Sequence, residues 1–97
     1  NMYIISLTYK VPLESVEKHL EDHIAYLNLH YELDHFHASG RKVPRTGGII
    51  LSKMTDKLQL ATILEQDPFK IHDLADYKIT EFIPSKTCEE WSFLKGS

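Results

Sequence analysis

Histidines are concentrated in one stretch of the chain, HLEDHIAYLNLHYELDHFH from His19 to His37, which holds five of the protein's six histidines. The imidazole is the side chain that titrates nearest to neutral pH, and it is also the commonest metal ligand in proteins. The stretch therefore allows three interpretations: a metal site, an acid–base catalytic site, or a helix and a strand that carry unrelated histidines.

The spacing of these histidines supplies only parts of a metal site. His19 and His23 are four residues apart, but the order His-Leu-Glu-Asp-His differs from the His-Glu-x-x-His of zinc peptidases. His35 and His37 share one face of a strand, and no spacing specifies a third ligand. The single cysteine, Cys88, excludes an intrachain disulfide and a thiolate-rich metal site. We expect no metal and no cofactor, with a histidine-based metal-binding protein as the weakest alternative.

His23 is the histidine best placed for acid–base chemistry. Its helix carries an apolar stripe that consists of Leu13, Val16, Leu20, Ile24, Leu27 and Tyr31. On a helical projection His23 falls at the edge of this stripe, whereas His19 and His30 fall nearer to solvent. An imidazole at such an edge is partly desolvated and still faces a cleft. A histidine that only packs and forms hydrogen bonds is the plain alternative.

Asp67 stands directly before Pro68, and this pair predicts the start of a helix. A carboxylate in that position accepts hydrogen bonds from free backbone N–H groups, and proline suits the first helical position. Capping alone explains Asp67, although its second oxygen is available to a pocket. The only basic cluster, Arg41 to Arg45, is sufficient for one small anionic ligand. The sequence contains neither a serine-nucleophile elbow nor a complete phosphate-binding loop.

The elements that must position these side chains follow from the hydrophobic pattern. Four strands are predicted: Tyr3–Tyr9, Asp34–Ser39, Gly48–Met54 and Tyr77–Ile83. Three helices are predicted: one of about five turns from Pro12 to Tyr31, one after Asp56 that ends near Leu64, and a short one from Pro68 to His72. The order βαββαβ predicts a ferredoxin-like α+β fold, with a four-stranded antiparallel sheet and the helices on one face.

The sheet face turned away from the helices is expected to combine apolar and polar side chains. In the second predicted strand, Phe36 and Ala38 are expected to face the helices, and His35, His37 and Ser39 the opposite side. Such a face is too apolar to remain bare and too polar for a dry core. We therefore expect a homodimer in which a second copy packs against this face, with a solvated sheet face as the alternative.

Length and composition indicate a single globular domain over residues 2–97, in which residues 85–97 form a C-terminal extension and Asn1 is an added residue. Hydrophobic residues make up 42% of the chain and charged residues 26%, values typical of a globular fold. The net charge of −3 argues against a nucleic-acid partner. No apolar run approaches the roughly 18 residues of a membrane span, and no signal peptide is visible. We expect no membrane partner and a cytoplasmic location.

Several segments resemble the YciI-like family. They are Tyr3–Tyr9, EDHIAYL around His23, ASGRKVPRTGGIIL from Ala38 to Leu51, DPF from Asp67 to Phe69, and LADYKITEFIPSK from Leu74 to Lys86. The resemblance implies a ferredoxin-like fold that dimerises through its sheets into a dimeric α+β barrel. It also implies a site built on the helix histidine and the aspartate of the Asp-Pro-aromatic motif, here His23 and Asp67. The family includes a dehydrochlorinating enzyme that acts on a chlorinated hydroquinone, and related barrels include muconolactone isomerases and small monooxygenases.

Two positions depart from the pattern of the family. Arginine often follows the helix histidine, where this chain has Ile24, and proline often follows the Ser-Gly pair, where this chain has Arg41. We therefore expect the cation near His23 to come from Arg41 or Arg45.

The residues and the resemblance together favour a small-molecule enzyme with His23 as general acid–base and Asp67 orienting and activating its imidazole. Arg41 or Arg45 would bind the anionic group of a small, anionic or aromatic substrate, and Ser39 would assist by hydrogen bonding. Lyase or isomerase chemistry would suit this arrangement. A non-catalytic dimeric protein that holds a metabolite in the same pocket is the alternative from a different functional class.

Overall fold

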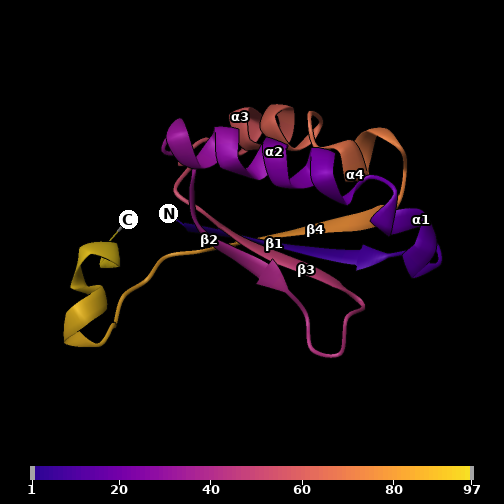
Figure 1. Cartoon of the computed structure of the whole chain (residues 1–97). Coiled ribbons are helices and arrows are strands. Elements are labelled where there is room, and N and C mark those ends of the chain that lie inside the picture. The colour runs from indigo at the N-terminus through magenta and orange to yellow at the C-terminus, as the bar shows by residue number, and fades with distance from the viewer. Residues whose placement is uncertain (1, 97) are drawn as a thin grey trace.

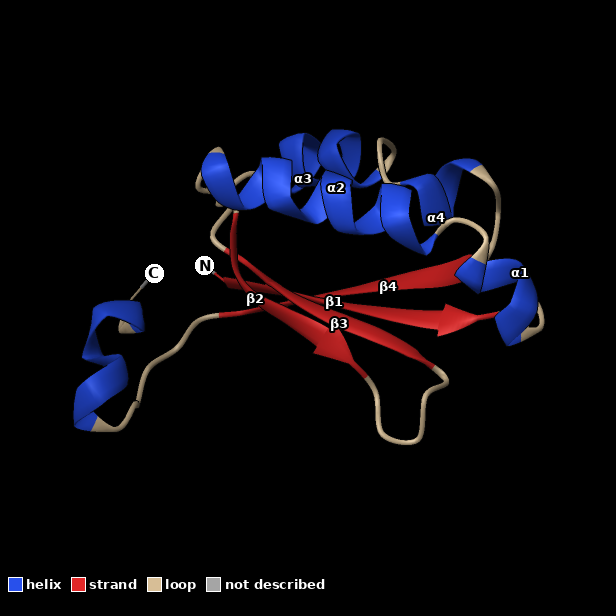
Figure 2. Cartoon of the chain, in the orientation of Figure 1, coloured by secondary structure: helices blue, strands red, loops and turns tan. Residues whose placement is uncertain are grey.

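The computed structural model describes residues 2–96 and shows a four-stranded antiparallel sheet with helices on one face (Figures 1 and 2). The elements in chain order are β1 (Met2–Tyr9), α1 (Leu13–Glu17), α2 (Leu20–Glu32), β2 (Phe36–Arg41), β3 (Gly47–Ser52), α3 (Lys57–Leu64), α4 (Pro68–Ile71), β4 (Ala75–Phe82) and the 3₁₀ helix η1 (Glu89–Leu94). The strand order is β2-β3-β1-β4, and all neighbouring strands are antiparallel. The predicted ferredoxin-like α+β fold is confirmed.

The hydrophobic core lies between the sheet and the helices. Alternate residues of the central strand β1, Tyr3, Ile5 and Leu7, are almost completely buried, as expected for the core-facing side of a strand. From the helical layer, Leu60 of α3 and Phe69 of α4 belong to the same cluster. Burial of each such side chain stabilises the fold by about 1.5–3 kcal/mol.

Two aspartates begin helices as predicted. The carboxylate of Asp56 accepts hydrogen bonds from the backbone N–H groups of Leu58 and Gln59 at the start of α3. The carboxylate of Asp67 accepts one from the N–H of Phe69 at the start of α4. Each carboxylate thus satisfies N–H groups that have no partner within the helix.

The prediction of one continuous helix from Pro12 to Tyr31 is wrong. The segment is divided into α1 and α2 by a turn at Lys18 and His19, and α2 begins at Leu20. The apolar residues keep a helical spacing across this turn, so periodicity alone did not indicate the break. The division matters for the site because α1 and α2 can then approach the sheet at different angles (Figure 1).

The predicted orientation of β2 is correct for Phe36, which is buried in the core, but wrong for Ala38 and Ser39. A register shift between Phe36 and Ala38 breaks the pairing of β2 with β3, so that Ala38 lies opposite Leu51 and Ser39 lies opposite the buried Ile50. A bulge adds one residue to a strand and inverts the alternation of side chains after it. Ser39 therefore faces the helices, and Ala38 faces away from them.

His30 is buried, contrary to its predicted place near solvent. Its side chain is 2% exposed, with Nδ1 2.9 Å from Nδ1 of His35 and Nε2 3.2 Å from Oε1 of Gln66. His35, which was expected on the opposite face of the sheet, precedes β2 and contacts His30 instead. Burial lowers the pKa of His30. The helical projection missed this because His35, Phe36 and Gln66, which lie outside α2, contact a side of the helix that the apolar stripe left to solvent.

The segment after β4 leaves the sheet and ends in η1, which lies apart from the helical layer (Figure 1). In this segment Leu94 is buried, whereas Trp91 and Phe93 are largely exposed. The ring of Phe93 lies 6.1 Å from the ring of His37. Within residues 2–96, none of the helices has the length and apolar character needed to cross a membrane.

Candidate active site

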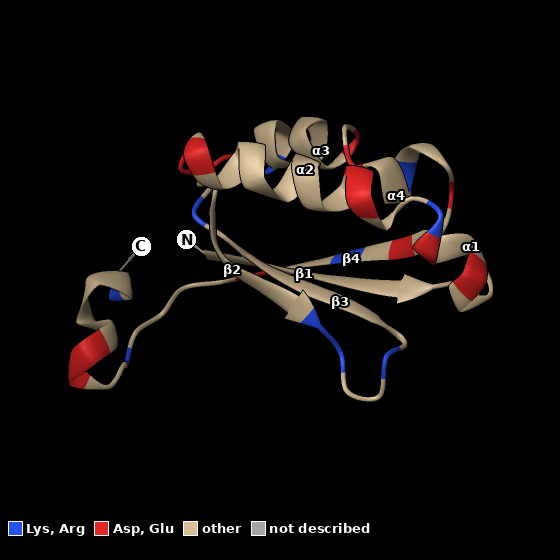
Figure 3. Ribbon diagram, in the orientation of Figure 1, with Lys and Arg blue, Asp and Glu red and all other residues tan. Residues whose placement is uncertain are grey.

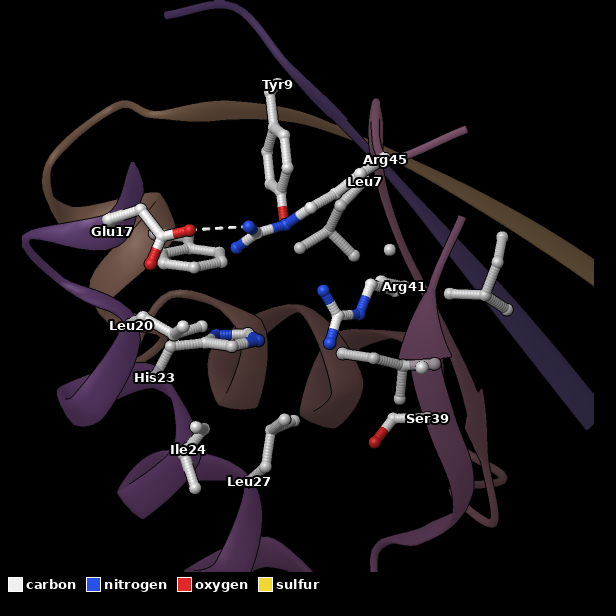
Figure 4. A pocket seen from close by; sticks show the side chains of 15 residues that line it. Leu7, Tyr9, Glu17, Leu20, His23, Ile24, Leu27, Ser39, Arg41 and Arg45 are labelled. Carbon is white, nitrogen blue, oxygen red and sulfur yellow. Dashed lines mark hydrogen bonds and ion pairs between the residues drawn. The ribbon is translucent and has the colours of Figure 1, made fainter. Parts of the chain in front are cut away.

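A cavity of about 500 Å³ lies between α2 and the half of the sheet that contains β2 and β3 (Figure 4). Its volume falls within the range of about 300–1,000 Å³ that is usual for small-molecule sites. Apolar side chains make up much of the lining, including Leu20, Ile24 and Leu27 of α2. The polar part of the lining comes from six residues: Tyr9, His23, Ser39, Arg41, Arg45 and Glu17, the last of which lies at one end.

The imidazole of His23 is directed from α2 into this cavity (Figure 4). Its Nδ1 lies 2.7 Å from Oδ1 of Asp67, so the contact expected between the two residues is present. The side chain of His23 is 12% exposed and that of Asp67 is completely buried. Asp67 therefore lies behind the imidazole, and Nε2 is the nitrogen that remains for a molecule in the cavity.

The partners of Asp67 assign the tautomer of His23. Oδ1 of Asp67 also accepts a hydrogen bond from the N–H of Phe69 at 3.0 Å, and Oδ2 accepts one from the hydroxyl of Tyr77 at 2.5 Å. Because both carboxylate oxygens already act as acceptors, Nδ1 of His23 is the donor in its hydrogen bond to Asp67. In the neutral imidazole Nε2 then carries the lone pair, which is the state that a general base requires.

Tyr77 is a permanent donor to Asp67. Burial, followed by the negative charge of Asp67, raises the pKa of Tyr77 far above its ordinary value. The hydroxyl therefore keeps its proton, and Oδ2 of Asp67 keeps its hydrogen bond. Asp67 thus receives hydrogen bonds from His23 on α2, from Phe69 on α4 and from Tyr77 on β4.

The ring of Phe69 fixes the plane of the imidazole. The two rings are stacked with centroids 3.9 Å apart and an angle of 3° between their planes. Tyr9 meets the same Phe69 edge to face, at 5.9 Å. The Asp-Pro-Phe sequence at the start of α4 therefore supplies two contacts to His23: the carboxylate at its ring edge and the aromatic ring at its face.

Basic residues lie at the end of β2 and on the loop to β3 (Figure 3). Arg41 and Arg45 both point into the cavity (Figure 4), together with Ser39. Nη1 of Arg45 lies 2.5 Å from Oε1 of Glu17, and this ion pair raises the pKa of Arg45. Oγ of Ser39 accepts a hydrogen bond from the hydroxyl of Tyr31 at 2.7 Å. The residues predicted to bind substrate thus line the same cavity as His23.

The other histidines lie outside this cavity. His19 is stacked on His72, with ring centroids 3.9 Å apart, and His30 contacts His35. Over residues 2–96, no three His, Cys, Asp or Glu side chains converge in a way that could hold a metal ion.

Sequence reasoning missed two residues of the site. Tyr77 was expected only as part of the fourth strand, because nothing local indicates that its hydroxyl reaches Asp67. Tyr77 lies two residues before the apolar Ile79, and side chains two apart in a strand share one face of the sheet. This spacing could have indicated that Tyr77 faces the helices, as Ile79 does. Glu17 was not singled out, because no short-range pattern links it to Arg45.

Comparison with known proteins identifies the family. The sequence model of the YCII-related domain matches residues 2–83. The chain belongs to the YCII-related family. The resemblance to YciI-like proteins noted from the sequence is therefore confirmed, and the match includes both His23 and Asp67. A search of curated proteins found no match.

Among solved structures, this YCII-related chain is similar to 5-chloro-2-hydroxyhydroquinone dehydrochlorinase from Burkholderia phenoliruptrix, determined in complex with 2,5-dihydroxybenzoquinone. The TM-score is 0.75 and the sequence identity is 15%, over 93% of this chain and 98% of the dehydrochlorinase. The likeness establishes that the two proteins share their fold over nearly their whole length.

Proposed function

We propose that this YCII-related protein is a small-molecule enzyme in which His23 acts as general acid–base on a small, anionic or aromatic substrate. The observation that carries the proposal is the position of His23, whose Nδ1 is held by the buried Asp67 while its ring points into the cavity. Phe69 and Asp67 hold the imidazole in one orientation, so its reactive nitrogen needs little reorganisation before proton transfer.

The proposed chemistry is of the lyase or isomerase type. The lone pair of Nε2 removes a proton from a carbon next to an electron-withdrawing group, and the imidazolium that forms is stabilised by the carboxylate of Asp67. In an elimination the electrons of the C–H bond form a new C=C bond, and a leaving group such as halide departs with its bonding pair. In an isomerisation His23 returns the proton to another carbon. A general base of this kind contributes about 10²–10⁴-fold to a rate.

We also propose that Arg41 or Arg45 binds the anionic group of the substrate and that Ser39 assists by hydrogen bonding. Guanidinium groups recognise carboxylate and related oxyanions, and all three residues line the cavity with His23. The structural neighbour is a dehydrochlorinase of a chlorinated hydroxyhydroquinone and was determined with a dihydroxybenzoquinone. Compounds of this kind carry acidic ring hydroxyl groups, which makes them suitable probes for a cavity that contains two arginines.

The test is turnover of a panel that includes 5-chloro-2-hydroxyhydroquinone and small halogenated aromatic acids, together with binding of 2,5-dihydroxybenzoquinone. We expect His23→Gln to reduce turnover at least about 100-fold and to leave binding within a few fold. His19→Gln is the matched control, because His19 lies outside the cavity, and it should retain wild-type turnover. If His23→Gln turns over substrate as fast as the wild type, the catalytic role is excluded. Binding of 2,5-dihydroxybenzoquinone that His23→Gln leaves unchanged, with no turnover of any compound by the wild type, would instead favour the non-catalytic metabolite-binding alternative.

We further propose that the protein is a homodimer formed through the sheet face opposite the helices. By strand register this face carries apolar Ile4 and Leu51 beside polar Ser6 and Thr80. A charged residue in its centre would be buried without a partner in the dimer. Leu51→Glu should therefore give a monomer in light scattering, and Leu58→Glu on the exposed surface of α3 should leave the mass unchanged. A wild-type protein with the mass of one chain would contradict this proposal.

A further inference from the structure

The two arginines of the cavity are not equivalent. We propose that Glu17 determines specificity: its carboxylate occupies Arg45, leaves Arg41 as the cation that receives the ligand, and so restricts the cavity to molecules with one anionic group. This inference rests on the proposed function in taking the ligand to be a small anion in the cavity beside His23. It adds which charge the ligand carries and which residue selects that charge.

The contact between Glu17 and Arg45 joins two separate parts of the fold. Glu17 is the last residue of α1, and Arg45 lies on the loop between β2 and β3. Nη1 of Arg45 is 2.5 Å from Oε1 of Glu17, and the pair lies at one end of the cavity (Figure 4). The side chain of Arg45 is 24% exposed and that of Glu17 is 49% exposed. Glu17 thus makes the contact with this guanidinium that the carboxylate of a ligand would otherwise make.

Arg41 is placed differently. It ends β2 and points into the cavity on the same side of the strand as Ser39, two residues earlier (Figure 4). No ion pair with Arg41 is found anywhere in residues 2–96. Its guanidinium therefore retains its full capacity for an oxyanion, and Ser39 can add a hydrogen bond to the same group.

The rest of the cavity lining indicates the chemistry of the uncharged part of the ligand. Leu20, Ile24 and Leu27 form an apolar wall next to His23, which suits an aromatic ring or a short hydrocarbon. A ligand with its single anionic group on Arg41 can place its apolar body against this wall. A second anionic group directed toward Arg45 would meet the carboxylate of Glu17. Binding sites use such like-charge contacts, in addition to favourable contacts with the correct ligand, to discriminate against competing ligands.

Calorimetric titration with simple aromatic probes tests this inference. The probes are benzoate, neutral benzamide, and the three benzenedicarboxylates, whose carboxylates differ in separation. The wild type should bind benzoate more tightly than benzamide and should bind no dicarboxylate more tightly than benzoate. Arg41→Gln should weaken the binding of benzoate at least about tenfold, because the charge-assisted hydrogen bonds to its carboxylate are lost.

The decisive variant is Glu17→Gln, which releases Arg45 without a large change in shape. The variant should bind the best dicarboxylate at least about tenfold more tightly than the wild type does. Its affinity for benzoate should change by less than about threefold. Glu14→Gln is the matched control, since it removes the same charge from α1 outside the cavity, and it should leave all affinities unchanged. Glu17→Ala repeats the test, and circular dichroism of each variant verifies that it is folded.

Three outcomes would overturn the inference: no binding of any probe by the wild type, unchanged benzoate binding in Arg41→Gln, or equal gains for benzoate and the dicarboxylates in Glu17→Gln. These titrations involve no turnover. The charge selection therefore stands or falls separately from the catalytic role of His23, which only the His23→Gln kinetics test.

Discussion

Nδ1 of His23 lies 2.7 Å from Oδ1 of Asp67, although the two residues are 44 positions apart in the chain. The carboxylate is completely buried and also accepts hydrogen bonds from the N–H of Phe69 and the hydroxyl of Tyr77. Asp67 is therefore more than a helix cap. It links α2, α4 and β4 at the back of the cavity and sets the orientation of the imidazole.

Asp67→Asn should lower the free energy of unfolding by about 1.5–3 kcal/mol, because charge-assisted hydrogen bonds in the buried site are lost. Urea denaturation measures this change. Asp56→Asn is a matched control, since Asp56 caps α3 near the surface and asparagine caps a helix about as well as aspartate. Equal losses in the two variants would show that Asp67 serves only as a cap.

The tautomer of His23 can be observed directly. In the neutral state the hydrogen bond to Asp67 should hold the proton on Nδ1 and leave Nε2 without one. Nitrogen chemical shifts of the histidine rings, recorded on ¹⁵N-labelled protein, distinguish the two tautomers. A neutral His23 with its proton on Nε2 would be incompatible with the role of general base at that nitrogen.

Tyr77→Phe should destabilise the protein by about 1–3 kcal/mol, because Oδ2 of the buried Asp67 loses its donor. Tyr31→Phe removes the same group from an exposed hydrogen bond to Ser39 and should cost less than about 0.5 kcal/mol. Thermal and urea unfolding of both variants provide the comparison. The prediction fails if the two substitutions have the same effect.

Gly47 and Gly40 should respond in opposite ways to alanine. A Cβ at Gly47 would lie 1.7 Å from the backbone oxygen of Leu7, so Gly47→Ala must disturb the pairing of β1 with β3. A Cβ at Gly40 meets nothing within 4 Å, and Gly40→Ala should stabilise strand β2 by up to about 1 kcal/mol. The melting temperatures of the two variants decide the matter, and a tolerated Gly47→Ala would refute the predicted strand contact.

Stability should fall as the pH drops below the ordinary histidine value of 6.5, because burial lowers the pKa of His30 in the folded protein. The unfolded chain then binds the proton more readily than the folded chain, so acid favours unfolding. Burial also lowers the pKa of His37, and this acts in the same direction. His30→Gln should therefore show a shallower loss of stability between pH 7.5 and pH 5.5 in urea titrations.

Tyr31→Phe, which changes no group that titrates in this range, should keep the wild-type slope. An identical slope in His30→Gln would mean that His30 does not contribute to the pH dependence.

The sequence by itself determined the four strands, their order relative to the helices, and the starts of α3 and α4. Alternation predicts a strand and a period of three to four predicts a helix, while a cap such as Asp56 or Asp67 acts on backbone groups two or three residues away. These signals are local, so they can be read from neighbouring residues. His23 and Asp67 could be singled out in the same way, one by its place on the helix and the other by the Asp-Pro pair, with support from the family resemblance.

Only the tertiary structure decided how distant residues meet. The bulge after Phe36 turned Ser39 toward the cavity, and contacts with His35, Phe36 and Gln66 accompany the burial of His30. Tyr77 reaches Asp67, and Glu17 reaches Arg45, because strand register and helix packing bring together elements far apart in the chain. Register, layer packing and loop position depend on the whole fold rather than on the period of any one segment, and they complete the surroundings of His23.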